Sequence, residues 1–330
     1  MGDHSFILLV VTIVLAITYA YGNGLNDAAN ALATTVATRV LTPASAVILG
    51  GTMNLVGALT GTAVAKTIGK GIVDPEFMTQ AAVLSAILAA VTWVFFATRF
   101  GFPVSVSHSL VAGVLGSGIA TAGVSKIDQV VVAKVLMALA LSPVLGFIGA
   151  FVFMVILSWG LRNWSRRTAN SVFGKLQIMS AGMLSYTHGK NDAQNAVGII
   201  ALGWAVYYSI DVTVEPWMQA VSGLAMAVGV AVGGWKVIHT LGTKITALHP
   251  TSGFAANIAA AGVIEAASSI GLPVSTTHTA SSAIIGVGAT RGLRSLSFGV
   301  IRGIFTAWLV TYPFCFGLGW LLAKISLVLT

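Results

Sequence analysis

Charged side chains are scarce in this sequence. They make up 8% of its 330 residues, whereas an ordinary soluble domain carries about 25% charged residues. Hydrophobic residues make up 56%. This composition excludes a disordered chain and argues strongly against a soluble enzyme.

Cysteine is also scarce, because Cys315 is the single one. One thiol cannot form a disulfide within the chain or supply a thiolate metal cluster. We therefore expect Cys315 to be a buried apolar residue, and the sequence does not indicate a redox compartment.

Long segments contain no Asp, Glu, Lys or Arg. They cover residues 4–26, 40–65, 77–98, 100–125, 135–161, 216–235 and 303–323. Most reach the roughly 20 residues that a helix needs to cross a bilayer. The segments are continuously apolar rather than alternating, which excludes a membrane β-barrel. Asp3 and His4 precede the first segment instead of basic residues, so we interpret it as a retained span and not a signal peptide.

Two motifs occur twice in the chain. GLNDAANA at residues 24–31 returns as GKNDAQNA at residues 189–196, and GFPVSVSHS at residues 101–109 returns as GLPVSTTHT at residues 271–279. The offsets are 165 and 170 residues, about half the chain. Two motifs in the same order at nearly one offset indicate a tandem duplication, with one repeat in residues 1–165 and the other in 166–330.

Loop charges indicate that the two repeats have opposite orientations. Lysines and acids balance in residues 66–76 and 126–128, whereas the corresponding segments 236–244 and 291–302 contain only basic charges. After the first motif the bias is reversed, since Arg39 corresponds to a segment with Asp211 and Glu215. Basic loops stay in the cytoplasm. We therefore place residue 39 and segments 162–175, 236–249 and 291–302 inside and both termini outside.

Opposite orientations require an odd number of crossings in each half, and we expect five. The spans are about 5–38, 43–65, 79–98, 102–122 and 129–160, then 172–208, 217–235, 251–270, 272–290 and 298–322. Gly22 and Gly24 should interrupt the first span, and Gly101 and Pro103 the fourth. The predicted fold is an all-α polytopic membrane protein of two inverted-topology repeats, with discontinuous helices or re-entrant hairpins and 10–12 membrane segments. Such broken helices are typical of secondary transporters, whose sites lie near the midplane.

The first motif carries an aspartate inside an apolar segment in each half. A carboxylate in an apolar membrane segment costs several kcal/mol of free energy unless it is paired or hydrated, so each aspartate is a functional candidate. Residues three and four apart share one helix face, and Asp and Asn oxygens form a cage suited to Na⁺. The predicted cation ligands are Asn26, Asp27, Asn30, Asn191, Asp192 and Asn195. The alternative is that these residues only cap broken helix ends.

The second motif offers hydroxyl and backbone N–H groups next to a proline. A helix N-terminus is a ready anion site, so hydroxyls from the two halves could surround a tetrahedral oxyanion. The predicted anion-binding residues are Ser105, Ser107, Ser275, Thr276 and Thr277. The alternative is that these hydroxyls bond back to their own helices. We interpret His108 and His278 as structural residues.

With these duplicated motifs the chain resembles the inorganic phosphate transporter (PiT) family over nearly its whole length. The resemblance implies uptake of inorganic phosphate driven by Na⁺ or H⁺, a homodimer, a place in the plasma (inner) membrane, and phosphate contacts from Gln194 and Asn23. Several family members have glutamate where this chain has Asn54 and Asn257. The absence of these two titratable groups favours Na⁺ over H⁺ as the coupling ion. Glu265 is the acid that remains in a second-half apolar segment.

Other functions fit parts of the sequence. Two intramembrane aspartates could form an aspartyl protease, although the duplicated asparagines have no role in that chemistry. A proton-coupled phosphate symporter, or a channel or permease for another oxyanion such as sulfate, fits the sequence better than a protease does. We expect Na⁺-coupled phosphate symport, with Na⁺ as the coupling ion, no organic cofactor, no catalysis and no nucleic-acid partner.

Overall fold

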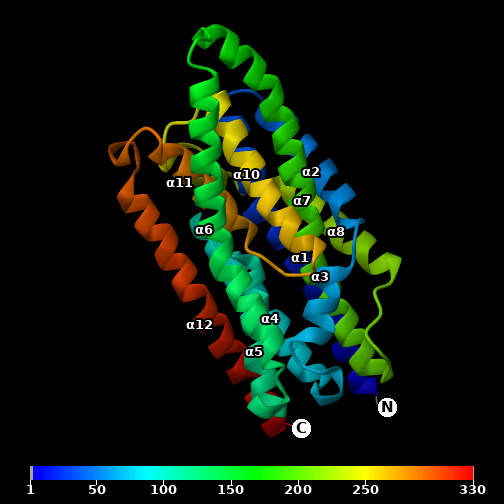
Figure 1. The fold of residues 1–330 in the computed structure, drawn as a ribbon. Coiled ribbons are helices and arrows are strands. Elements are labelled where there is room, and N and C mark those ends of the chain that lie inside the picture. Colours follow the sequence, from blue (N-terminus) through cyan, green and yellow to red (C-terminus); the bar gives the residue numbers. More distant parts are fainter. Residues whose placement is uncertain (1–2, 330) are drawn as a thin grey trace.

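A computed structural model describes residues 3–329, nearly all of them helical (Figure 1). The helices are α1 (Asp3–Ala37), α2 (Pro43–Ala58), α3 (Ala63–Lys66), α4 (Gln80–Phe100), α5 (Val106–Ala122), α6 (Gln129–Gly160), α7 (Arg166–Tyr208), α8 (Pro216–Val232), α9 (Trp235–His239), α10 (Pro250–Ser269), α11 (Thr276–Ala289) and α12 (Phe298–Leu329). Short π-helical turns extend α3 through η1 (Thr67–Gly71) and α9 through η4 (Thr240–Lys244).

Several of these helices are long and apolar enough to cross a membrane. Four qualify singly, α1, α4, α6 and α12, and the bent pairs α2–α3 and α8–α9 raise the number to six among the described residues. This confirms the expected all-α polytopic membrane fold. By length and composition α5, α7, α10 and α11 do not qualify, so ten to twelve segments stays a prediction.

The order of elements in α1–α6 recurs in α7–α12. Each set has a long helix, a bent pair, two helices joined by a short loop, and a second long helix of 32 residues. Figure 1 shows the chain ends together at one end of the molecule and the α6–α7 connection at the other. Opposite membrane orientation of the two halves stays a prediction.

The expected interruption of the first span is wrong. α1 runs unbroken through Gly22 and Gly24, and α7 runs unbroken through its copy of the motif. The glycines permit close packing instead. A Cβ on Gly24 would overlap the Met226 carbonyl in α8, and a Cβ on Gly189 would overlap the Asn54 carbonyl in α2. Small residues at membrane helix crossings let backbones approach in this way.

The sharp breaks lie in the second segment of each half, which we expected to be a plain span. α2 and α3 meet at 63°, and so do α8 and α9. Gly61 at the first break has φ +87°, and Gly233 at the second has φ +72°. These values suit glycine, which explains why the helices end there. Residues 43–65 and 217–235 are therefore broken elements.

The expected break at the second motif is confirmed. Gly101 ends α4 with φ +75°, and Gly271 follows α10 with the same φ. Ser105 and Ser275 then begin α5 and α11 as N-caps, each accepting a hydrogen bond from the backbone N–H of the histidine three residues later at 3.1 Å. A glycine in the left-handed region and a serine N-cap are the usual devices for ending one helix and starting another.

Two apolar cores lie on either side of the middle. One combines α3, α4 and α5 of the first half with the C-terminal part of α7. The other combines α9, α10 and α11 of the second half with the C-terminal part of α1. α1 and α7 therefore each pass from one core to the other near the middle of the helix, where the Asn-Asp motif lies. The duplicated polar residues are brought together at this junction.

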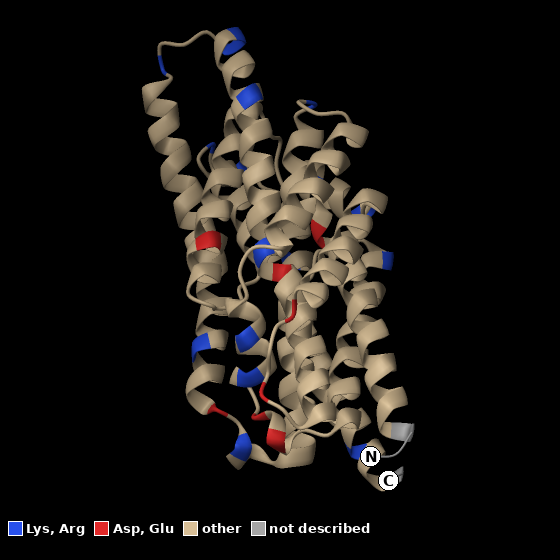
Figure 2. Cartoon of the chain, turned by 90° about the vertical axis from the view of Figure 1, so that its right-hand side faces the viewer, with Lys and Arg blue, Asp and Glu red and all other residues tan. Residues whose placement is uncertain are grey.

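Charge is unevenly distributed along the molecule. In Figure 2 the end away from the termini carries Lys and Arg, whereas the Asp and Glu that are drawn lie in the middle or toward the termini. α6 separates Lys126 from Arg166, since it fills most of the chain between them. A helix of that length spans about 48 Å, more than the hydrocarbon layer.

Cysteines that replace Lys126 and Arg166 are expected to react from opposite membrane faces. In a Cys315→Ala background, an impermeant maleimide should label Lys126→Cys in intact cells and Arg166→Cys only after permeabilisation, because the basic end stays inside. Equal labelling of both variants in permeabilised cells is the control. Labelling of both in intact cells would contradict the inverted topology.

Candidate functional site

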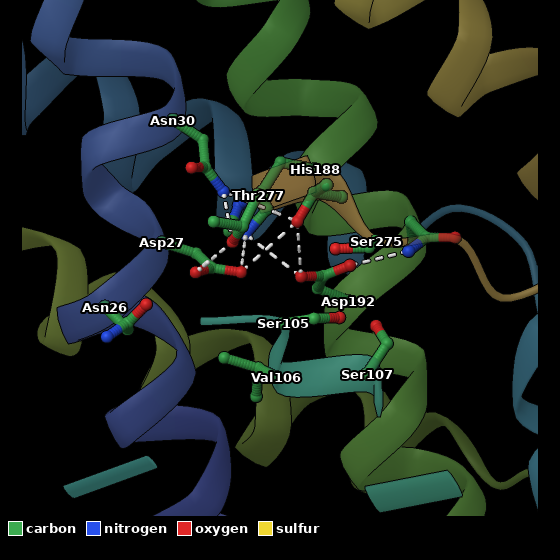
Figure 3. Close-up of polar contacts among 12 residues, drawn as sticks. Asn26, Asp27, Asn30, Ser105, Val106, Ser107, His188, Asp192, Ser275 and Thr277 are labelled. Carbon is green, nitrogen blue, oxygen red and sulfur yellow. Dashed lines mark hydrogen bonds and ion pairs between the residues drawn. The ribbon is translucent and has the colours of Figure 1, made fainter. Parts of the chain in front are cut away.

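The middle parts of α1 and α7 bring the two Asn-Asp motifs together inside the protein (Figure 3). Asp27 and Asp192 are each 1% exposed. His188 lies between them, with Nε2 3.3 Å from Asp192 Oδ2 and 3.7 Å from Asp27 Oδ2. One ligand atom from each of these three residues lies within 4.8 Å of the other two, close enough to hold one cation.

The first two residues of α11 supply hydroxyl groups to both acids. Thr276 Oγ1 lies 2.9 Å from Asp192 Oδ2 and 3.2 Å from Asp27 Oδ2, and Thr277 Oγ1 donates to Asp27 Oδ1 at 2.7 Å. Asp27 thus binds hydroxyls from the opposite half of the chain. Hydrogen bonds to a carboxylate are stronger than neutral ones, so they help to hold buried charge.

The last asparagine of each motif also reaches across to the other half. Asn30 Nδ2 donates to Thr277 Oγ1 at 3.1 Å, and Asn195 Nδ2 donates to Ser107 Oγ at 2.8 Å. Within residues 3–329, Asn30 Oδ1 and Asn195 Oδ1 are buried and accept no hydrogen bond. Each motif therefore has one buried amide oxygen without a partner among the described residues.

The first asparagine of each motif fastens the loop of its own half. Asn26 Nδ2 donates to the Phe102 carbonyl at 3.1 Å, and Asn26 Oδ1 accepts from the Val104 N–H at 3.3 Å. Asn191 Nδ2 donates to the Val274 carbonyl at 3.1 Å and to Asp192 Oδ1 at 2.6 Å. Asn26 and Asn191 thereby position the loops that begin α5 and α11.

The two residues suggested by the family resemblance differ in their surroundings. Gln194 Oε1 accepts from the Ala65 N–H at 3.0 Å, and Gln194 Nε2 donates to the Lys190 carbonyl at 2.5 Å. Asn23 is fully buried, and neither side-chain polar atom finds a partner among the described residues. Because buried amides are nearly always satisfied, Asn23 marks a place where a polar ligand is expected.

His188 is the site residue that the sequence analysis missed. The 165-residue offset aligns it with Asn23, and this alignment was the available signal. His188 Nδ1 lies 2.5 Å from Asn54 Oδ1, so Asn54 also belongs to the site. Asn257 lies in α10, and its Oδ1 accepts from Thr34 Oγ1, farther along α1, at 3.0 Å.

Three other candidate groups lie outside the acid cluster. Glu265 forms an ion pair with Lys190 and accepts from Ser269 Oγ at 3.1 Å. The rings of His108 and His278 lie 4.6 Å apart, and His278 also stacks on Trp308. These histidines connect α5, α11 and α12 and directly follow Ser107 and Thr277 in the chain.

Comparison with known proteins identifies the transported substrate of similar chains. The model of the phosphate transporter family matches residues 23–319. A Bacillus subtilis protein named "Probable low-affinity inorganic phosphate transporter" is 39% identical over 96% of each chain. A Rhizobium meliloti protein of the same name is 40% identical over 94% of this chain and 93% of its own.

A solved structure shares the whole fold. It is described as the sodium-dependent phosphate transporter, and it matches with a TM-score of 0.90 and 26% identity over 98% of this chain and 100% of the other. These proteins are transporters, which is not an enzyme class, and none is described as a protease. With its apolar helices the chain is a membrane protein, and it belongs to the phosphate transporter family.

Proposed function

We propose that the protein imports inorganic phosphate across the plasma membrane by symport with Na⁺ and alternating access. The observation that carries this proposal is the meeting of Asp27 and Asp192, one from each repeat, in a single buried cluster with the hydroxyls of Thr276 and Thr277. Buried acids inside a membrane protein generally serve an ion pathway.

The cation ligands in this proposal are oxygens around the two acids. Asp27 and Asp192 supply charge, and Asn30 and Asn195 supply amide oxygens that accept nothing from the residues described. Asn26 and Asn191 complete the motif by holding the adjacent loops. Several neutral oxygens around one or two carboxylates suit Na⁺, which needs many ligands at once. A proton needs one titrating base.

Phosphate in this proposal binds at the starts of α5 and α11. Helix N-termini have free N–H groups and a favourable dipole for anions. Ser107, Thr276 and Thr277 add hydroxyls, while Ser105 and Ser275 shape the helix starts as caps. The remaining proposed contacts come from Gln194 and Asn23, and the unpartnered amide of Asn23 supports its part in the site.

Coupling follows from the closeness of the two proposed sites. Thr276 and Thr277 contact the acids directly, so phosphate at these hydroxyls would lie beside the cation. Na⁺ would offset part of the phosphate charge, and each ligand should tighten binding of the other by the same factor. The solved relative is described as sodium-dependent, which favours Na⁺ over H⁺ as the driving ion.

Alternating access in this proposal comes from the repeats. Inverted repeats supply two related arrangements with exchanged openings, and the elements that carry the motifs would move against the other helices. A homodimer is the proposed assembly, on the family resemblance alone. Proton coupling and transport of sulfate remain the alternatives to test.

Phosphate uptake into proteoliposomes is expected to follow an imposed Na⁺ gradient at constant pH. Labelled phosphate should accumulate with external Na⁺ and not with external K⁺ at equal ionic strength. Labelled sulfate in the same vesicles tests the choice of anion. Uptake that ignores Na⁺ but follows a pH gradient would assign H⁺ as the coupling ion, and equal sulfate uptake would reject phosphate specificity.

A further inference from the structure

An apolar groove of about 470 Å³ opens on the protein surface between the end of α4 and the start of α12. α12 lies at the outer edge of the molecule, beside α4 and α5 (Figure 1). Phe96 and Phe102 form one side of the groove, and Gly299, Gly303 and Val310 lie along the other. None of the residues proposed to bind the cation or phosphate lines the groove, and the proposed transport function does not use it.

Two glycines of α12 line the groove. Gly299 and Gly303 lie one turn apart on α12, and a Cβ on either would have nothing within 4 Å among the described residues. Aligning the starts of α6 and α12 matches these glycines with Val130 and Lys134. At the equivalent positions α6 thus carries large side chains in place of the glycines of α12.

The length of the groove matches one leaflet of a bilayer. Gly299 and Val310 are the first and last lining residues on α12, and eleven residues of helix rise about 16 Å. Half of the hydrocarbon core of a bilayer is about 15 Å. The groove is therefore about as long as one leaflet is thick, which is the length of one acyl chain.

Charge at the outer end of the groove is positive. Arg302 is the one charged residue that lines it within the described part of the chain. At the same end of α4, Lys236 Nζ donates to the Arg99 carbonyl at 3.1 Å, which brings a second cation near. Figure 2 shows basic residues at this end of the molecule. The guanidinium group of Arg302 can reach the surface while the aliphatic part of its side chain packs against apolar residues.

We infer that this groove binds an anionic phospholipid of the surrounding membrane. One acyl chain lies along Gly299 and Gly303 between the aromatic rings of α4, and the headgroup phosphate contacts Arg302. Basic pockets between membrane helices at the cytoplasmic side recognise anionic headgroups by this chemistry. The inference requires only that the chain spans a membrane.

Native mass spectrometry of the purified full-length protein can count bound lipid during titration with phosphatidylglycerol or phosphatidylcholine. The wild type is expected to bind phosphatidylglycerol about fivefold more tightly, the effect of one basic residue near an anionic group. Arg302→Gln should abolish this preference. Arg294→Gln is the matched control, because Arg294 lies in a neighbouring turn (Leu293–Ser295) and does not line the groove.

Gly303→Leu tests the groove itself without a change of charge. It should lower the binding of both lipids, while unchanged thermal unfolding shows that the exposed substitution leaves the fold intact. Equal binding of the two lipids by the wild type, or equal effects of Arg302→Gln and Arg294→Gln, would overturn the inference. So would a Gly303→Leu protein that binds lipid normally, or one that changes only the monomer–dimer ratio, since a second copy would then fill the groove.

Discussion

Phosphate uptake driven by Na⁺ is expected to fall roughly 100-fold or more when either Asp27 or Asp192 is replaced by asparagine. The replacement keeps the shape of the side chain and one oxygen for the threonine hydroxyls, but it removes a charge that the cation needs. Losing one partner of a buried charge pair costs about 3–5 kcal/mol, which corresponds to this factor. Because coupling is reciprocal, phosphate binding should weaken as well.

Initial uptake rates of Asp27→Asn and Asp192→Asn in proteoliposomes, at matched protein content, measure this effect. Asp128→Asn is the matched control. Asp128 caps α6 by accepting from the N–H groups of Val130 and Val131, and asparagine caps a helix equally well. Thermal unfolding of all three variants separates lost transport from lost folding. Normal uptake with normal Na⁺ dependence in both site variants would show that the acids are only structural.

A second large effect is expected from one added methyl group at Gly24 or Gly189. Each glycine lies where two helices cross, and the new Cβ would overlap a backbone carbonyl of the neighbouring helix. A backbone cannot rotate aside as a side chain can, so the helices must separate. We expect Gly24→Ala and Gly189→Ala to lower the free energy of unfolding by about 3 kcal/mol, the upper end for overpacked cores.

Thermal unfolding in detergent and the monodisperse fraction on size exclusion measure this loss. The matched control is Gly262→Ala in α10, where a Cβ has nothing within 4 Å among the residues described. Alanine favours helix over glycine by about 1 kcal/mol, so the control should be neutral or slightly more stable. If all three variants unfolded at the same temperature, close helix packing would not be the reason for the motif glycines.

Membrane helices and the repeat were predictable from the sequence, because both depend on local composition and on self-similarity. The breaks at Gly101 and Gly271 were also predictable, since a glycine followed by proline ends a helix locally. The role of Gly24 was not. Glycine ends a helix in one setting and permits close packing in another, and only the position of α8 decides between them.

The candidate site was predicted by residue type but not by role. Asp27 and Asp192 meet as expected, because the duplicated motifs occupy equivalent places in the two halves. Asn26 and Asn30 share a motif, yet one fastens its own loop and the other contacts the opposite half. His188 was missed because it differs in residue type from Asn23, the position with which the 165-residue offset aligns it.

The exchange of contacts between the halves bears on how such a chain could have arisen. A polypeptide with one repeat alone would carry an asparagine equivalent to Asn30 or Asn195 without the helix start that it binds, so two copies would have to associate. Fusion into one chain lets equivalent positions diverge independently. Asn23 and His188 have done so. The candidate site is consequently chemically asymmetric although the order of helices repeats, and in the proposed transport cycle influx and efflux need not proceed at equal rates.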